Sequence, residues 1–124
     1  MQNLAEKVLI GQWRSFKAFK RTGEVKLFNN KTFKEVEINN DRTLRIKTHK
    51  EQTVKQEAQT NKWGVVFKDK RFYLEVPDYS LAYEIITVNH TVLVLLDLYT
   101  KDKVFFAKDS HWESFLESNQ LIVL

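Results

Sequence analysis

The histidines and carboxylates are the side chains of this sequence best suited to catalysis or metal binding. The three histidines are His49, His90 and His111, and no two of them are two or four residues apart. Metal sites in proteins commonly draw on closely spaced pairs of ligands. We therefore expect neither a metal site nor another cofactor in this protein.

Acid–base catalysis requires two carboxylates that converge, or a carboxylate beside a histidine. Glu75, Glu84 and Asp97 lie in segments otherwise rich in apolar residues, where a charged residue usually marks the solvent-facing side of a strand. The chain has no cysteine, only three glycines and no motif for a nucleophile or a phosphate-binding loop. We expect that this protein is not an enzyme.

Positive charge is in modest excess, with 20 Lys and Arg against 16 Asp and Glu, and both signs are interspersed along the chain. This distribution is typical of a solvated surface. The densest basic segment interleaves basic and aromatic side chains: Arg14, Phe16, Lys17, Phe19, Lys20 and Arg21. Such a pattern can bind single-stranded nucleic acid by stacking and phosphate contacts, and we keep that function as a less favoured alternative.

Short segments of alternating apolar and polar residues make up most of the chain. Three β-hairpins are predicted, each from two such segments and the turn between them: residues 32–47, 63–76 and 81–98. Residues 13–21 predict an irregular first strand, and residues 104–107 predict a last one. The polar residues 49–61 predict an exposed edge strand.

Short helices are expected at both ends of the chain. Leu4, Val8 and Leu9 have helical spacing, and Ser110 and Glu113 have the spacing of a capping box. Strands joined by turns of a few residues are antiparallel neighbours. We therefore predict an all-β fold: an antiparallel meander β-barrel of about eight to ten strands with short N-terminal and C-terminal helical segments, in one domain of residues 1–124.

The strand at residues 92–96 is apolar at every position, so both of its faces must be covered. One face would look into the barrel, and a helix or a second subunit would cover the other. The apolar C-terminal residues 121–124 would pack on the barrel or pair with a sheet edge. A structural or protein-interaction barrel with a filled core, in a homodimer, is therefore an alternative function.

No segment approaches the roughly 20 apolar residues that a transmembrane helix needs. Residues 1–10 include Glu6 and Lys7 rather than a continuous apolar core, so they do not resemble a signal peptide. The location expected by default is the cytoplasm, or outside it if a leader has been removed. The lack of cysteine leaves the compartment open.

Four segments, taken in order, resemble bacterial lipocalin-like domains of the calycin group. They are residues 9–13 (Leu-Ile-Gly-Gln-Trp), residues 36–41, residues 61–65, and residues 83–86 with 91–95. Fatty-acid-binding proteins and avidin-like barrels have related starts. This sequence differs from the pattern at Asp41-Arg42, where relatives commonly have Asp-Gly.

The resemblance implies a structural plug at one end of the barrel. In lipocalins the early tryptophan, here Trp13 after Gly11, packs beneath a basic side chain from the last strand in a cation–π arrangement. Lys108 or Lys103 would be that partner. A ligand would then enter at the opposite end.

The resemblance also implies a small hydrophobic or amphipathic ligand inside the barrel. We expect inward-facing residues to form its site: Leu44, Ile46, Trp63, Val65, Phe67, Phe72, Leu74, Tyr83, Ile85, Val94, Leu96 and Phe106. Tyr83 is the most ligand-like, because its hydroxyl would orient a polar head group. A barrel of eight strands is wide enough either to hold one small ligand or to be filled by side chains, and both outcomes stay open.

Overall fold

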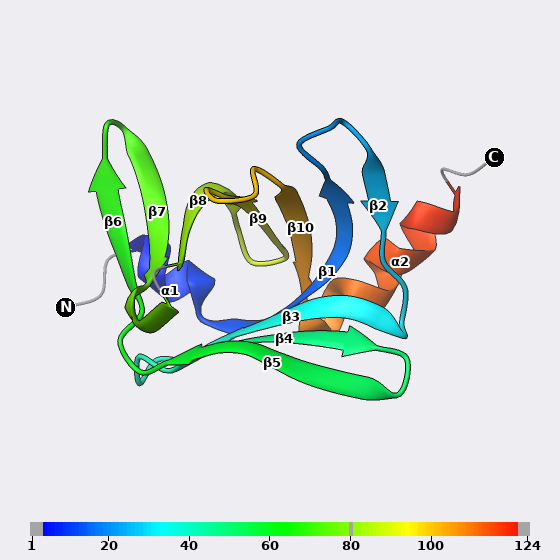
Figure 1. The fold of residues 1–124 in the computed structure, drawn as a ribbon, viewed down its shortest axis with the longest axis horizontal. Coiled ribbons are helices and arrows are strands. Elements are labelled where there is room, and N and C mark those ends of the chain that lie inside the picture. The colour runs from blue at the N-terminus through cyan, green and yellow to red at the C-terminus, as the bar shows by residue number, and fades with distance from the viewer. Residues whose placement is uncertain (1–3, 80, 122–124) are drawn as a thin grey trace.

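Ten β-strands form one antiparallel sheet that curls into a half-barrel in the computed structural model, which describes residues 4–79 and 81–121 (Figure 1). The strands are β1 (Gly11–Phe19), β2 (Val25–Leu27), β3 (Thr32–Ile38), β4 (Leu44–Lys50), β5 (Thr53–Thr60), β6 (Gly64–Lys68), β7 (Arg71–Val76), β8 (Leu81–Val88), β9 (Val92–Asp97) and β10 (Lys103–Lys108). The helices are α1 (Leu4–Leu9) and α2 (Trp112–Leu121), with 3-10 turns η1 (Pro77–Tyr79) and η2 (Asp109–His111). The predicted all-β, barrel-like fold with two short helices is confirmed.

The strand order is β5-β4-β3-β1-β10-β9-β8-β7-β6, and β2 pairs with β1 beside this path. All three predicted hairpins form, as β3–β4, β6–β7 and β8–β9. The predicted irregularity of the first strand is a register shift between Ser15 and Lys17 of β1. The first and last strands of the chain, β1 and β10, join its two halves into one sheet.

The two ends of the sheet are β5 and β6, which are consecutive in the chain but do not pair with each other. Near the segment that joins them, the Thr60 hydroxyl donates a 2.8 Å hydrogen bond to Asp78, and Lys62 lies 3.2 Å from the same carboxylate. Beyond that corner the β6–β7 hairpin rises away from β3, β4 and β5 (Figure 1). The wall is therefore open between β5 and β6, and the predicted barrel is realised as a half-barrel with two edges.

Arg42 lies in the turn between β3 and β4. Arg42 adopts a positive φ of 73°, a conformation that glycine adopts most easily. Its guanidinium forms an ion pair with the buried Glu6 of α1 and lies 4.8 Å from the centre of the Trp63 ring. The side chain therefore ties α1 and Trp63 to the β3–β4 turn, a contact that glycine cannot make.

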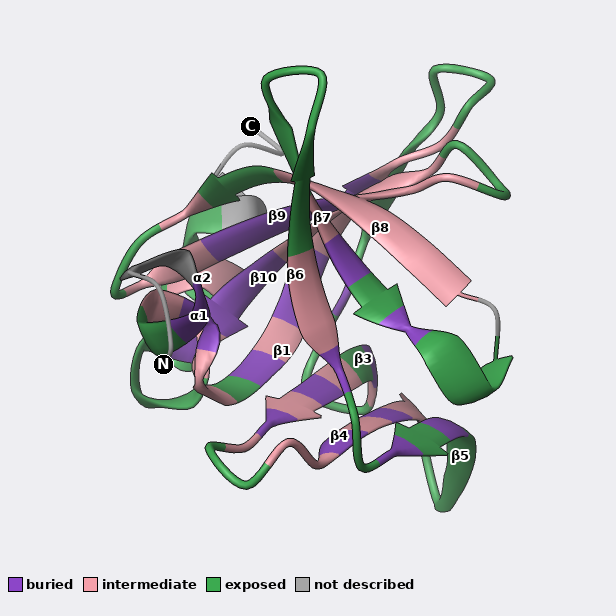
Figure 2. Cartoon of the chain, turned by 90° about the vertical axis from the view of Figure 1, so that its left-hand side faces the viewer, coloured by how far each residue is buried: buried purple, intermediate pink, exposed green. Residues whose placement is uncertain are grey.

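Two hydrophobic clusters lie on opposite faces of the sheet. The inner core, on the concave face, contains Trp13, Val36 and Leu95 among its buried residues. The outer core lies beneath α2, where Phe16 and Trp112 are buried. The bulge in β1 serves both clusters, because it lets the neighbouring residues Ser15 and Phe16 both be buried. Buried residues alternate with less buried ones along β1 and β3 (Figure 2).

The prediction that Val94 and Leu96 of β9 face into the barrel is wrong. Leu93 and Leu95 belong to the inner core, so Val94 and Leu96 face the opposite side of the sheet. Val94 is only 4% exposed in the single chain, so the chain itself covers this face of β9 at Val94. The contact expected of residues 121–124 lies outside the side chains that the structure describes.

Candidate functional site

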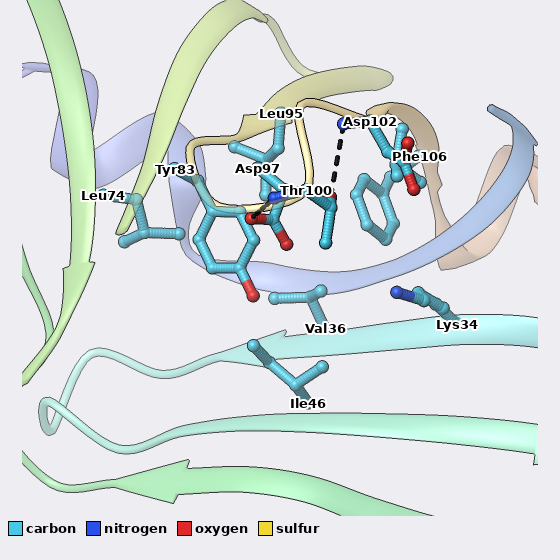
Figure 3. A pocket seen from close by; sticks show the side chains of 11 residues that line it. Lys34, Val36, Ile46, Leu74, Tyr83, Leu95, Asp97, Thr100, Asp102 and Phe106 are labelled. Atoms are coloured by element: carbon cyan, nitrogen blue, oxygen red, sulfur yellow. Dashed lines mark hydrogen bonds between the residues drawn. The ribbon is translucent and has the colours of Figure 1, made fainter. Parts of the chain in front are cut away.

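A cavity of about 80 Å³ lies inside the half-barrel, between β3 and β4 on one side and β7 to β10 on the other (Figure 3). Its apolar floor consists of Val36, Ile46, Leu74, Leu95, Val104 and Phe106. Its polar wall consists of Tyr83, Asp97, Thr100 and Asp102, and Lys34 faces this wall from β3. Lys34 and Thr100 are exposed, which places the opening on their side.

The loop from Asp97 to Asp102 shapes the polar wall. Asp97 Oδ1 accepts hydrogen bonds from the backbone N–H groups of Tyr99 (2.8 Å) and Thr100 (3.1 Å). The Thr100 hydroxyl accepts a bond of 3.2 Å from the Asp102 N–H. Asp102 is in turn paired with Lys20, 3.4 Å away. This short network fixes both carboxylates at the rim of the cavity.

Tyr83 lies beside Asp97, because the two residues are paired across β8 and β9. Its ring hangs from β8, and its hydroxyl points across the cavity toward Val36 and Ile46 (Figure 3). Burial raises the pKa of Tyr83 to about 12, with help from the negative charges of Asp97 and Glu57. The hydroxyl therefore stays neutral at physiological pH and can both donate and accept hydrogen bonds.

Lys34, on the other side of the cavity, is one of several lysines around Lys26. Burial lowers the pKa of Lys26, and the charges of Lys20, Lys34 and Lys50 lower it further. The charges of these three lysines are therefore close enough to Lys26 to act on it. The cavity has Asp97 and Asp102 on one side, the latter paired with Lys20, and Lys34 on the other.

The residues expected to bind a ligand fall into four groups. Ile46, Leu74, Tyr83 and Phe106 line the cavity. Leu44, Trp63, Val65 and Ile85 belong to the inner core or pack against it. Phe67 and Phe72 face the concave side of the β6–β7 hairpin but are 62% and 40% exposed near its tip. Val94 and Leu96 lie on the other face of the sheet, as noted above.

Sequence reasoning missed several cavity residues: Lys34, Val36, Leu95, Asp97, Thr100, Asp102 and Val104. Alternation carries a signal for one of the charged ones. Lys34 has the same parity as Val36 on β3, whereas Asp97 shares its parity with Leu95 on β9, where no alternation marks the inward side. Both charged residues continue an inward-facing row toward the opening.

The residues predicted to form a structural plug, Gly11, Trp13 and Lys108, lie outside this cavity. Lys108 Nζ is 4.4 Å from the centre of the Trp13 ring, whereas Lys103 pairs with Phe19 at the other end of β1. The fully buried Trp13 donates its indole N–H to the Leu9 carbonyl at 2.7 Å. Gly11 has a φ of 149°, and a Cβ there would lie 2.7 Å from Lys108 Cε. Trp13 is therefore held by contacts within the chain.

The alternative sites are poorly supported. No group of three or more potential metal ligands occurs among residues 4–79 and 81–121. His49 stacks on Phe33 and lies 2.9 Å from Glu35. In the basic segment, Phe16 is buried and Arg14 is 3.0 Å from Asp109, so neither is presented as a stacking surface for nucleic acid.

No protein-family model, curated protein or solved structure matches the chain. The lipocalin-like resemblance therefore stays a prediction. Within its described part, the structure contains no helix long and apolar enough to cross a membrane.

Proposed function

We propose that this protein is a non-enzymatic binding protein for a small amphipathic molecule, held in the cavity of the half-barrel. The observation that carries the proposal is the division of the cavity into an apolar floor and a polar wall at its opening. Ligand sites in proteins commonly combine these two features. The same cavity favours a bound ligand over the alternative of a core filled by side chains.

The size of the cavity limits the ligand. On the same measure one water molecule needs about 10–15 Å³, so about 80 Å³ accommodates a small organic molecule and excludes a long lipid chain in this conformation. The open wall between β5 and β6 would let the cavity widen, because no backbone hydrogen bonds join those strands.

Binding rather than catalysis is the function that the residues support. None of the three histidines lines the cavity. Of its two carboxylates, Asp102 is paired with Lys20, and Asp97 is fixed by two backbone N–H groups. These contacts hold charges in place, as a recognition site requires.

Native mass spectrometry of gently purified protein tests this proposal, because a retained molecule reveals its own mass. The control is Ile46→Phe, which enlarges a floor residue into the cavity, with circular dichroism to verify folding. We expect a small added mass in the wild type and none in the variant. Equal added mass in both would contradict a cavity site. So would a wild type that retains no member of a mixture of small amphipathic compounds.

A further inference from the structure

Two opposite charges face the cavity from different strands. Asp97 ends β9, and Lys34 lies on β3 across the cavity from it (Figure 3). The ion pairs found among the described residues do not include one between them. The carboxylate and the ammonium group are therefore separated by more than 4.0 Å, the limit for such a pair. A ligand between them would meet both charges.

The Asp97 carboxylate is prepared to receive a hydrogen-bond donor. Both of its intramolecular hydrogen bonds, from Tyr99 and Thr100, end on Oδ1. Its second oxygen points into the cavity, as does the Tyr83 hydroxyl (Figure 3). A carboxylate and a hydroxyl both accept hydrogen bonds. Together they suit an ammonium group, which has donors to satisfy each of them.

The charges farther out have the same polarity. Glu57 adds negative charge near Tyr83, while Lys26 lies near enough to Lys34 for the charge of Lys34 to lower its pKa. An anion placed in the cavity would be repelled by Asp97, and a cation would be repelled by the lysines. A molecule with both charges avoids each repulsion when its ammonium group lies at Asp97.

We propose that the ligand of the cavity is a small zwitterion with an apolar body, the simplest example being an α-amino acid with an apolar side chain. Its ammonium group would bind Asp97 and Tyr83, its carboxylate would bind Lys34 at the opening, and its side chain would lie on the apolar floor. This inference rests on the proposed function, because it specifies the ligand of the same cavity.

Four probes with similar apolar bodies measure how much each charge of the ligand contributes to binding. They are leucine, 3-methylbutan-1-amine, 4-methylpentanoate and 4-methylpentan-1-ol, titrated into the full chain while backbone amide shifts are followed by NMR. Hydrogen bonds to charged groups are the stronger kind, so we expect leucine to bind at least about tenfold more tightly than the other three. The amine should bind more tightly than the carboxylate, because Lys34 is exposed to solvent.

Two substitutions test which residue binds each charge of leucine. Asp97→Asn should weaken leucine binding at least about tenfold, and Lys34→Met should weaken it less, while binding of 4-methylpentan-1-ol changes little in both. The matched controls are Asp69→Asn in the β6–β7 turn and Lys47→Met, which faces away from the cavity on β4. Neither control should alter leucine binding.

The outcomes distinguish the inference from the proposed function. If 4-methylpentan-1-ol shifts the cavity amides and binds as tightly as leucine, the zwitterion is excluded and the binding function stands. If leucine binding falls equally in Asp97→Asn and Asp69→Asn, Asp97 is not its partner and the inference is overturned. If none of the four probes shifts the cavity amides, the proposed function fails as well.

Discussion

The surroundings of Trp13 and the cavity differ in how their polar groups are used. Around Trp13 the indole N–H bonds to the Leu9 carbonyl, and Lys108 bonds to the Ile10 carbonyl while covering the ring. Around the cavity, Lys34 and Asp97 face each other without forming an ion pair. The first region satisfies its polar groups within the chain, which stabilises the fold. The second presents charges to a space where a ligand can meet them.

Of the substitutions that distinguish the two regions, Trp13→Ala should cause the largest loss of stability. Removing this fully buried side chain should lower the free energy of unfolding by about 3–5 kcal/mol. Chemical denaturation monitored by circular dichroism would measure the loss. Tyr99→Ala is the control, because Tyr99 is 91% exposed, and it should cost less than about 0.5 kcal/mol. Similar losses in both variants would contradict the structural role of Trp13.

Gly11→Ala should cause the next largest loss of stability. The new Cβ would approach Lys108 Cε at 2.7 Å in a backbone conformation that alanine rarely adopts. We expect a loss of about 1–3 kcal/mol in the free energy of unfolding. Gly64→Ala is the matched control, because no atom lies within 4 Å of a Cβ at that position. The plug would be less tightly packed than described if the two variants were equally stable.

The burial of Tyr83 in the cavity should instead be detectable in how stability depends on pH. Burial raises the pKa of Tyr83 to about 12, above the usual tyrosine value of 10.0. The folded state therefore binds more protons than the unfolded state between pH 10 and 12, and stability should fall as pH rises through that window. Tyr83→Phe should reduce this slope and should remove an absorbance transition near pH 12. A wild type whose tyrosines all ionise near pH 10 would contradict the burial of Tyr83.

The smallest effect is expected at the β6–β7 tip. Phe67 is 62% exposed, and its ring packs against that of the exposed Phe72, with ring centres 4.9 Å apart. Phe67→Ser should change the free energy of unfolding by about 0.5–1 kcal/mol at most, and it should leave ligand binding unchanged. Loss of binding in this variant would show that the tip closes over the ligand.

Much of the fold could be predicted because the local signals agree with it. Alternation on both sides of the Asn39–Arg42 turn identifies β3 and β4, and Asp69 and Lys70 both adopt the positive φ values of a hairpin turn. The polar residues of β5 correctly predict an edge strand. Each of these features depends on residues that are close in the sequence.

The site was harder to predict for three physical reasons. In β9 every residue from Val92 to Leu96 is apolar, so no alternation indicates which side faces inward. Phe67 and Phe72 face the concave side, but their exposure depends on the gap between β5 and β6, which is a tertiary feature. Lys34 and Asp97 are charged, and charged residues in strands usually face solvent.

Titration of wild-type protein and the Ile46→Phe variant with 4-methylpentan-1-ol tests the central claim most directly. This neutral probe depends on the cavity and not on the zwitterion inference. In the wild type we predict saturable amide shifts around Ile46, Leu74 and Leu95. In the variant we predict at least about tenfold weaker binding, because one extra methylene in a packed site already costs about 1–3 kcal/mol. Equal affinities, or no shifts at the cavity residues of the wild type, would contradict the claim that the half-barrel holds a ligand.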